Sequence, residues 1–316
     1  MAIVSYNFAL DGFQYPINTG WLSTFGEIDF DGEEPVVLIN PRYWISGSPS
    51  NWANSANWSE TSGGPGGATI PTPRNVAVFD TSGLGSCTMD ASAFVYGIYV
   101  NGYSGTISQN NKDIVCSFAS FFSGTFEGDG SNISTATDFA VGGTCDFTST
   151  DGTVSCDGTF LFAPSTGTFY HNNGAVSLDG TGAYLNAPNI TLSKLQLNAS
   201  QARINRALTV EDQLHLQRGG CRKIQPDATV HLKGDLYSGS NYNQWSIFND
   251  FPIEFDSTTK QTIFNQNGSV TPSVLVNKTV SDQVILEGRG PFVIKDELRI
   301  QDGTFNSNGI NLQVGL

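Results

Sequence analysis

The sequence predicts an all-β protein, an elongated β-solenoid of short stacked strands with an irregular, aromatic-rich N-terminal cap. Three observations predict this fold class. Turn-then-strand motifs recur along the chain, glycine is abundant with 35 residues, and no run shows helical periodicity beyond about two turns. Self-similar segments are typical of repeat architectures, in which each unit buries its apolar face against the next.

The first 45 residues are predicted to be an anchor or docking segment. Acidic residues there alternate with Ile28 and Phe30, which is the period of a strand with one face in water. These acids are either a docking surface for a basic partner or the solvated side of a protected sheet edge. The residues are Glu27, Asp29, Asp31, Glu33 and Glu34.

Tryptophans gather in the next segment, before a glycine- and proline-rich loop at residues 63–67. Trp52 and Trp58 are candidates for a platform that stacks on a host glycan. The alternative interpretation is that these indoles close the open end of a β core.

Residues 46–190 are predicted to form an acidic β-repeat module rich in Gly, Thr and Phe. Motifs such as Ser123-Gly124-Thr125-Phe126 supply a turn residue followed by the start of a strand. Cys116 and Cys145 lie 29 positions apart, which suggests a solenoid coil of that length. In such a coil phenylalanine would stack on phenylalanine and cysteine on cysteine.

Residues 191–316 are predicted to form a second solenoid module with two repeats of about 80 residues. Residues 208–219 match residues 292–303 at a spacing of 84. Each copy reads as a strand, a polar turn and a second strand with alternating apolar residues. Aligned pairs include Val210 with Ile294, Asp212 with Asp296, and Leu214 with Leu298.

The formal net charge of −14 is unevenly distributed. Residues 1–190 hold 17 acidic and 3 basic side chains, whereas residues 194–316 hold 12 of each. Binding to a nucleic-acid backbone needs a basic patch, so nucleic acid is disfavoured as a partner. No apolar run is long enough to span a membrane, and the first residues do not have the pattern of a signal peptide.

No catalytic, cofactor or metal site is predicted. The histidines at 171, 215 and 231 have no metal-ligand spacing, and alternation places His215 and His231 on outer, solvated faces. The acidic pairs Glu211/Asp212 and Asp296/Glu297 recur at one point of both repeats, which favours turn residues over a catalytic pair. The five cysteines are interpreted as buried free thiols, with one disulfide as the alternative.

Several segments together resemble the β-solenoid repeat proteins of bacteriophage tail fibres and appendages, and related repeats of bacterial surface adhesins. These segments are Asn57-Trp58-Ser59, the glycine-rich loop, and Gly303-Thr304-Phe305-Asn306-Ser307-Asn308-Gly309. The resemblance covers residues 44–316 in style. It implies a structural protein that assembles with other virion proteins, forms a homo-oligomer, often a trimer, and contacts a host surface glycan.

The resulting expectation is a structural virion protein, a subunit of a phage fibre, spike or capsid appendage used in assembly and host attachment. The absence of a leader pattern favours the virion, assembled in the host cytoplasm. One alternative is an extracellular adhesin or filament subunit at a bacterial cell surface. Another is a tailspike-type enzyme that degrades polysaccharide with paired carboxylates.

Overall fold

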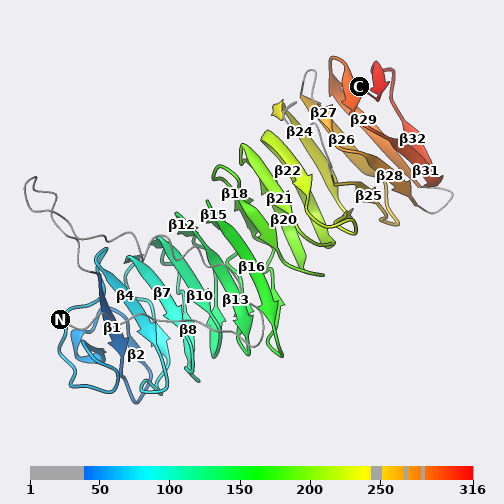
Figure 1. The fold of residues 1–316 in the computed structure, drawn as a ribbon. Helices are drawn as coiled ribbons and strands as arrows, with labels where there is room; N and C mark the ends of the chain where they lie inside the picture. Colours follow the sequence, from blue (N-terminus) through cyan, green and yellow to red (C-terminus); the bar gives the residue numbers. More distant parts are fainter. Residues whose placement is uncertain (1–38, 243–250, 267–269, 279–281, 316) are drawn as a thin grey trace, which may run out of the picture. The chain divides into compact units, whose positions relative to one another are not determined.

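A computed structural model describes residues 39–242, 251–266, 270–278 and 282–315. Within these ranges the chain is almost entirely β-strand, and parallel strands stack into a β-solenoid of about ten turns (Figure 1). The predicted fold class is therefore confirmed. In the described part of the chain, no helix is long and apolar enough to cross a membrane.

Three parallel ladders form the sides of the coils up to β22 (Leu208–Lys223). The first contains β1 (Asn40–Trp44), β4 (Asn75–Phe79), β7 (Gly97–Val100), β10 (Phe118–Phe121), β13 (Phe139–Gly143), β16 (Thr159–Pro164), β19 (Tyr184–Asn186) and β21 (Gln201–Ile204). The second contains β2 (Ser50–Asn51), β5 (Cys87–Thr88), β8 (Thr106–Ser108), β11 (Thr125–Glu127), β14 (Asp146–Thr148) and β17 (Phe169–Tyr170). The third contains β6 (Ala93–Phe94), β9 (Ile114–Cys116), β12 (Ile133–Thr135), β15 (Thr153–Cys156), β18 (Ala175–Leu178) and β20 (Thr191–Leu197), and it runs on into β22.

Beyond β22 the third ladder continues as two parallel runs. One contains β23 (Val230–Leu232), β25 (Ile253–Phe255), β28 (Val274–Asn277) and β31 (Leu298–Asp302). The other contains β24 (Asp235–Tyr242), β26 (Gln261–Gln266), β29 (Gln283–Arg289) and β32 (Thr304–Asn306). A short fourth ladder contains β27 (Val270–Thr271), β30 (Phe292–Ile294) and β33 (Leu312–Val314). The remaining elements are the 3-10 turn η1 (Ser55–Asn57) and β3 (Trp58–Ser59), which pairs antiparallel with β1.

Alternation along each strand builds the core, because every second side chain points inward. On the third ladder, one inward column runs through all the coils from β6 to β29 without a polar member. Its residues are Ala93, Ile114, Ile133, Val154, Val176, Leu195, Leu214, Leu236, Ile263 and Leu286, all buried.

Stacked phenylalanines fill the core of the earlier coils. Phe147 lies between Phe126 and Phe169, with ring centroids 4.7 and 5.9 Å away and nearly parallel planes. Phe139 stacks on Phe160 in the same way, at 5.2 Å. The prediction that phenylalanine stacks on phenylalanine is confirmed.

The predicted coil of 28 or 29 residues is wrong. In the inward column Ile114 pairs with Ile133, 19 positions later, and the longest step, from Leu236 to Ile263, is 27. Cysteine does not stack on cysteine either, since Cys116 pairs with Thr135. The spacing between similar motifs did not give the coil length, because successive turn motifs lie on different sides of the same coil.

The 84-residue repeat does not correspond to the stacking register. Val210 pairs with Leu232, and its column continues through Phe255 and Val276 to Ile300. Ile294, its partner in the sequence alignment, belongs to the fourth ladder. Because alternating apolar residues recur on many strands, the sequences of two strands can match well although the strands lie on different sides of the solenoid.

The ladders run through both expected module boundaries, after residue 45 and after residue 190. β1 pairs with β4, so the chain belongs to the solenoid from Asn40, a few residues before the expected end of the anchor. At residue 190 the stack does not break, because β18 pairs with β20. What changes nearby is the shape of the coil, since the second ladder ends at β17 (Phe169–Tyr170).

At the corners of the earlier coils, aspartate side chains accept hydrogen bonds from backbone N–H groups of a neighbouring coil. Asp138 Oδ1 accepts from the backbone N of Thr159 at 2.7 Å, and Asp113 Oδ1 accepts from Asn132 at 3.0 Å. Asp146 Oδ1 accepts from Thr168 at 3.1 Å. These carboxylates pair with peptide dipoles and therefore need no basic partner.

Candidate functional site

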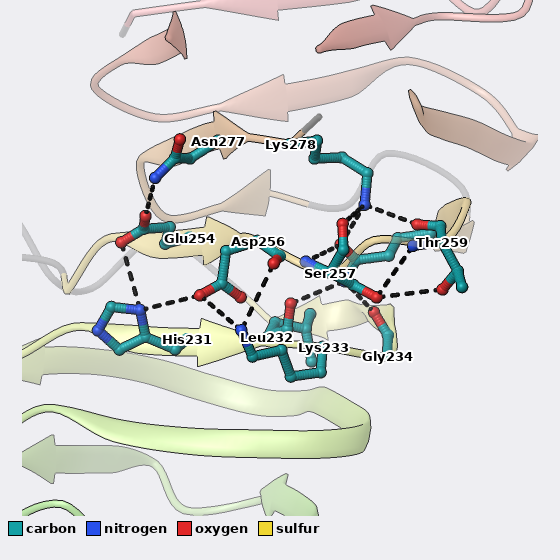
Figure 2. Close-up of polar contacts among 11 residues, drawn as sticks. His231, Leu232, Lys233, Gly234, Glu254, Asp256, Ser257, Thr259, Asn277 and Lys278 are labelled. Carbon is teal, nitrogen blue, oxygen red and sulfur yellow. Dashed lines mark hydrogen bonds and ion pairs between the residues drawn. The ribbon is translucent and has the colours of Figure 1, made fainter. Parts of the chain in front are cut away.

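A cluster of charged and polar side chains lies on the outer face of β23, β25 and β28 (Figure 2). We call it the outer cluster, and it consists of His231, Lys233, Glu254, Asp256 and Asn277. Alternation positions it: Val230 and Leu232 point into the core, so the histidine between them points outward. The register then places Glu254 directly beside His231 on the neighbouring coil.

The distances within the outer cluster are short. His231 Nδ1 lies 3.3 Å from Glu254 Oε2 and 3.4 Å from Asp256 Oδ2. Lys233 Nζ lies 2.9 Å from the same Asp256 oxygen. Asn277 Nδ2 donates to Glu254 Oε1 at 2.8 Å. One imidazole, one ammonium and one amide thus converge on two carboxylates, one within β25 and one directly after it.

The carboxylates are more deeply buried than the groups around them. The side chains of Glu254 and Asp256 are 14% and 18% exposed, against 35% for His231 and 42% for Lys233. Asp256 Oδ1 is buried and has no hydrogen-bond partner among the described residues. The cluster therefore offers acceptor capacity that its own donors do not fill.

A second polar centre lies beside the outer cluster, where the Lys278 ammonium is held by three oxygens (Figure 2). Its Nζ donates to the Ser257 and Thr259 carbonyls at 2.8 and 2.7 Å and to Gln261 Oε1 at 2.7 Å. Lys278 is 2% exposed, and burial lowers its pKa, partly offset by Asp282 and Asp256. Three fixed acceptors around a buried ammonium pin the corner after β25.

The tryptophans of the predicted glycan platform lie inside the core. Trp52 and Trp58 are 2% and 0% exposed, and their rings pack edge to face at 4.9 Å. Trp58 Nε1 donates to the Trp52 carbonyl at 2.7 Å, and Trp44 packs against the other side of Trp58 at 5.3 Å. Neither candidate presents an open ring face to a sugar, and the arrangement matches the alternative interpretation as core residues.

The other acidic candidates are five residues outside the described ranges and two pairs within them. Glu27, Asp29, Asp31, Glu33 and Glu34 lie outside the described residues. Glu211 and Asp212 sit at an irregularity in the pairing of β22 with β20, where Glu211 pairs with His171 and Asp212 with Lys194. Asp296 and Glu297 lie in the exposed bend between β30 and β31. The two acidic pairs thus occupy different local structures.

The histidines have more neighbours than the sequence suggested. His215 points outward as predicted, but its ring stacks on Tyr237 at 4.5 Å, and Tyr237 stacks on Phe264 at 4.6 Å. Burial in this aromatic ladder lowers the pKa of His215, and Lys194 acts in the same direction. His171 Nε2 lies 3.0 Å from Glu211 Oε2.

Four cysteines are buried free thiols: Cys87, Cys116, Cys145 and Cys156. Burial raises the pKa of Cys116 to about 12 and, with a smaller contribution from Asp146, that of Cys145 to about 12. A buried thiol that keeps its proton at neutral pH packs as a small apolar side chain. The prediction of buried free thiols is confirmed for these four residues.

Sequence reasoning missed the outer cluster because its members are far apart in the chain. His231 and Glu254 are 23 positions apart, which matches no metal or catalytic motif. The signal that could have found them is the coil length. A coil of 23 residues, instead of 28 or 29, would have placed Glu254 beside His231.

The comparisons with known proteins give no relative. No family model, curated protein or solved structure matches this chain.

Proposed function

We propose that this chain is a structural virion protein, a subunit of a bacteriophage fibre, spike or capsid appendage. The observation that carries the proposal is the unbroken inward column from Ala93 to Leu286. Each coil buries its apolar face only by stacking on the next, which makes a continuous stiff body out of short local units. Such a body suits spacing and presentation, which are the tasks of a fibre.

The outer surface gives further support. Inter-coil contacts there include polar ones, such as the Asp138 to Thr159 bond and the pairing of Lys233 with Asp256. A wet outer face with local polar pairing keeps a large β surface from associating indiscriminately. The resemblance of the repeats to phage fibre repeats points to the same class of protein.

The test is immunogold electron microscopy of a culture of the source, with antibody raised against the full chain. The proposal predicts label on released phage particles, and the labelled position distinguishes capsid, collar and fibre. Label on bacterial envelopes with bare particles would contradict it and favour an adhesin. A fall in the viscosity of host polysaccharide on incubation with the protein would instead favour a depolymerase.

A further inference from the structure

We propose that His231, Glu254 and Asp256 form a binding site for a first-row divalent metal ion, for which Zn²⁺ is the reference ion. Their donor atoms, Nδ1, Oε2 and Oδ2, all lie within 4.8 Å of one another. Two of the separations are 3.3 and 3.4 Å. Tetrahedral zinc with bonds of about 2.0–2.2 Å places its ligands about 3.3–3.5 Å apart. Two of the three separations thus match zinc-ligand spacing.

The donor chemistry selects the class of ion. One imidazole nitrogen with two carboxylate oxygens suits zinc and its first-row neighbours. Calcium and magnesium prefer sites made of oxygen alone. Three protein donors also leave a coordination position open, and the 35% exposure of the His231 side chain leaves room there for water or a group from a partner.

The surroundings hold these donors in place. His231 comes from β23 and Glu254 from β25, two strands fixed in register by the parallel ladder, and Asp256 directly follows β25. Asn277, from the next coil, donates to the Glu254 oxygen that faces away from the histidine. Such supporting hydrogen bonds orient metal ligands and commonly alter affinity. The unpartnered Asp256 Oδ1 provides a further acceptor beside the ion.

Lys233 is the competitor for this site. Its ammonium lies 2.9 Å from Asp256 Oδ2, the oxygen that would bind the metal. A metal ion must therefore displace it, and the 42% exposure of the Lys233 side chain allows it to move into solvent. The outer cluster thus exchanges one cation for another, and removal of the lysine charge should strengthen metal binding.

Metal binding would join two coils through side chains as well as through backbone hydrogen bonds. Because the ligands are brought together only in the folded chain, a bound ion stabilises the fold by mass action. This consequence is independent of whether the protein belongs to a virion.

The experiment is isothermal titration calorimetry of ZnCl₂ into the full chain, free of any histidine tag and stripped of metal with a chelator. The wild-type chain should bind one zinc ion at this site at neutral pH. His231→Gln and Glu254→Gln should each weaken binding by about 100-fold or more, and Asn277→Ala by about 10-fold. Lys233→Gln should tighten it.

His171→Gln is the matched control, because His171 pairs with a single carboxylate. It should leave zinc binding unchanged. Cobalt(II) added to the wild-type chain should give the intense visible absorption of tetrahedral coordination, which needs no variant. Absence of zinc binding, binding that survives His231→Gln, or an affinity unaffected by Lys233→Gln would each overturn the proposal.

Discussion

The coils at residues 75–178 and those at residues 230–306 hold their corners together in two different ways. In the earlier coils aspartates such as Asp138 and Asp146 accept backbone N–H groups from a neighbouring coil. The later coils keep one such contact, from the Thr262 N–H to Asp235 Oδ1, and add lysines: Lys233 pairs with Asp256, and the Lys278 ammonium donates to backbone carbonyls. A carboxylate bound to peptide N–H groups needs no basic residue, which fits the scarcity of Lys and Arg in the earlier coils.

The interiors differ as well. In the earlier coils, stacked rings with Phe147 at their centre lie in the core together with the aliphatic inward column that begins at Ala93. In the later coils that aliphatic column continues as Leu236, Ile263 and Leu286. The comparison teaches that one backbone architecture accepts two packing schemes while the inward column from Ala93 to Leu286 stays apolar. Four changes test this difference, from the largest expected effect to the smallest.

Phe147→Ala should have the largest effect. The ring is 1% exposed and touches Phe126 and Phe169 in its own column, and Phe121 and Phe139 beside it. Its removal leaves a cavity and should lower the free energy of unfolding by about 3–5 kcal/mol in chemical denaturation. Tyr170→Ala, which truncates a side chain that is 55% exposed, is the control. Equal losses for the two would contradict the aromatic core.

Lys278→Met should come next. It keeps the apolar stem but leaves the Ser257 and Thr259 carbonyls and Gln261 Oε1 without their donor. The expected loss is about 2–3 kcal/mol, because unsatisfied buried acceptors are costly. Lys260→Met is the matched control, since Lys260 is 55% exposed and 3.9 Å from Glu287. An unchanged free energy of unfolding for Lys278→Met in urea would show that these three hydrogen bonds do not stabilise the fold.

Asp138→Ala tests the aspartate contacts of the earlier coils. It removes the acceptor for the Thr159 backbone N–H and should cost about 1 kcal/mol. Asp138→Asn keeps an oxygen acceptor and should cost less. Comparing the two variants distinguishes the role of the hydrogen-bond acceptor from that of the charge. A larger loss of unfolding free energy for Asp138→Asn than for Asp138→Ala would refute the role of the hydrogen bond.

His215→Gln should have the smallest effect, visible only as a change in pH dependence. The pKa of His215 is lowered in the folded chain, chiefly by burial, from an ordinary value of about 6.5. The unfolded chain therefore binds a proton at higher pH than the folded chain does. Stability should fall as the pH drops below about 6.5, and His215→Gln should flatten that part of the profile. An unchanged melting temperature profile between pH 7 and about 5 would contradict the prediction.

The fold class could be predicted from sequence because alternation and turn motifs are local signals. Gly124, followed by Thr125 and Phe126, predicts a turn and then a strand, whichever neighbouring strand pairs with it. The register could not be predicted in the same way. Many strands share the same alternation, so Val210 matched Ile294 in sequence although its neighbour in space is Leu232.

The outer cluster illustrates the same limit for the site. The outward direction of His231 follows from its apolar neighbours Val230 and Leu232, and it was predicted correctly. Its carboxylate neighbours depend on coil length, and the loops between coils vary that length from one turn to the next. The identity of the residue beside His231 is therefore a property of the stack and of no local motif.

The most direct test of this account measures which coil lies on which. Nitroxide labels at Val115→Cys and Ser134→Cys occupy paired positions on β9 and β12, 19 residues apart. The comparison pair, Val115→Cys with Thr144→Cys, has the 29-residue spacing that the cysteine motifs suggested. The account predicts strong dipolar broadening in the continuous-wave EPR spectrum of the first pair and weaker broadening of the second. The reverse order would contradict the stacking register that builds the core of the earlier coils.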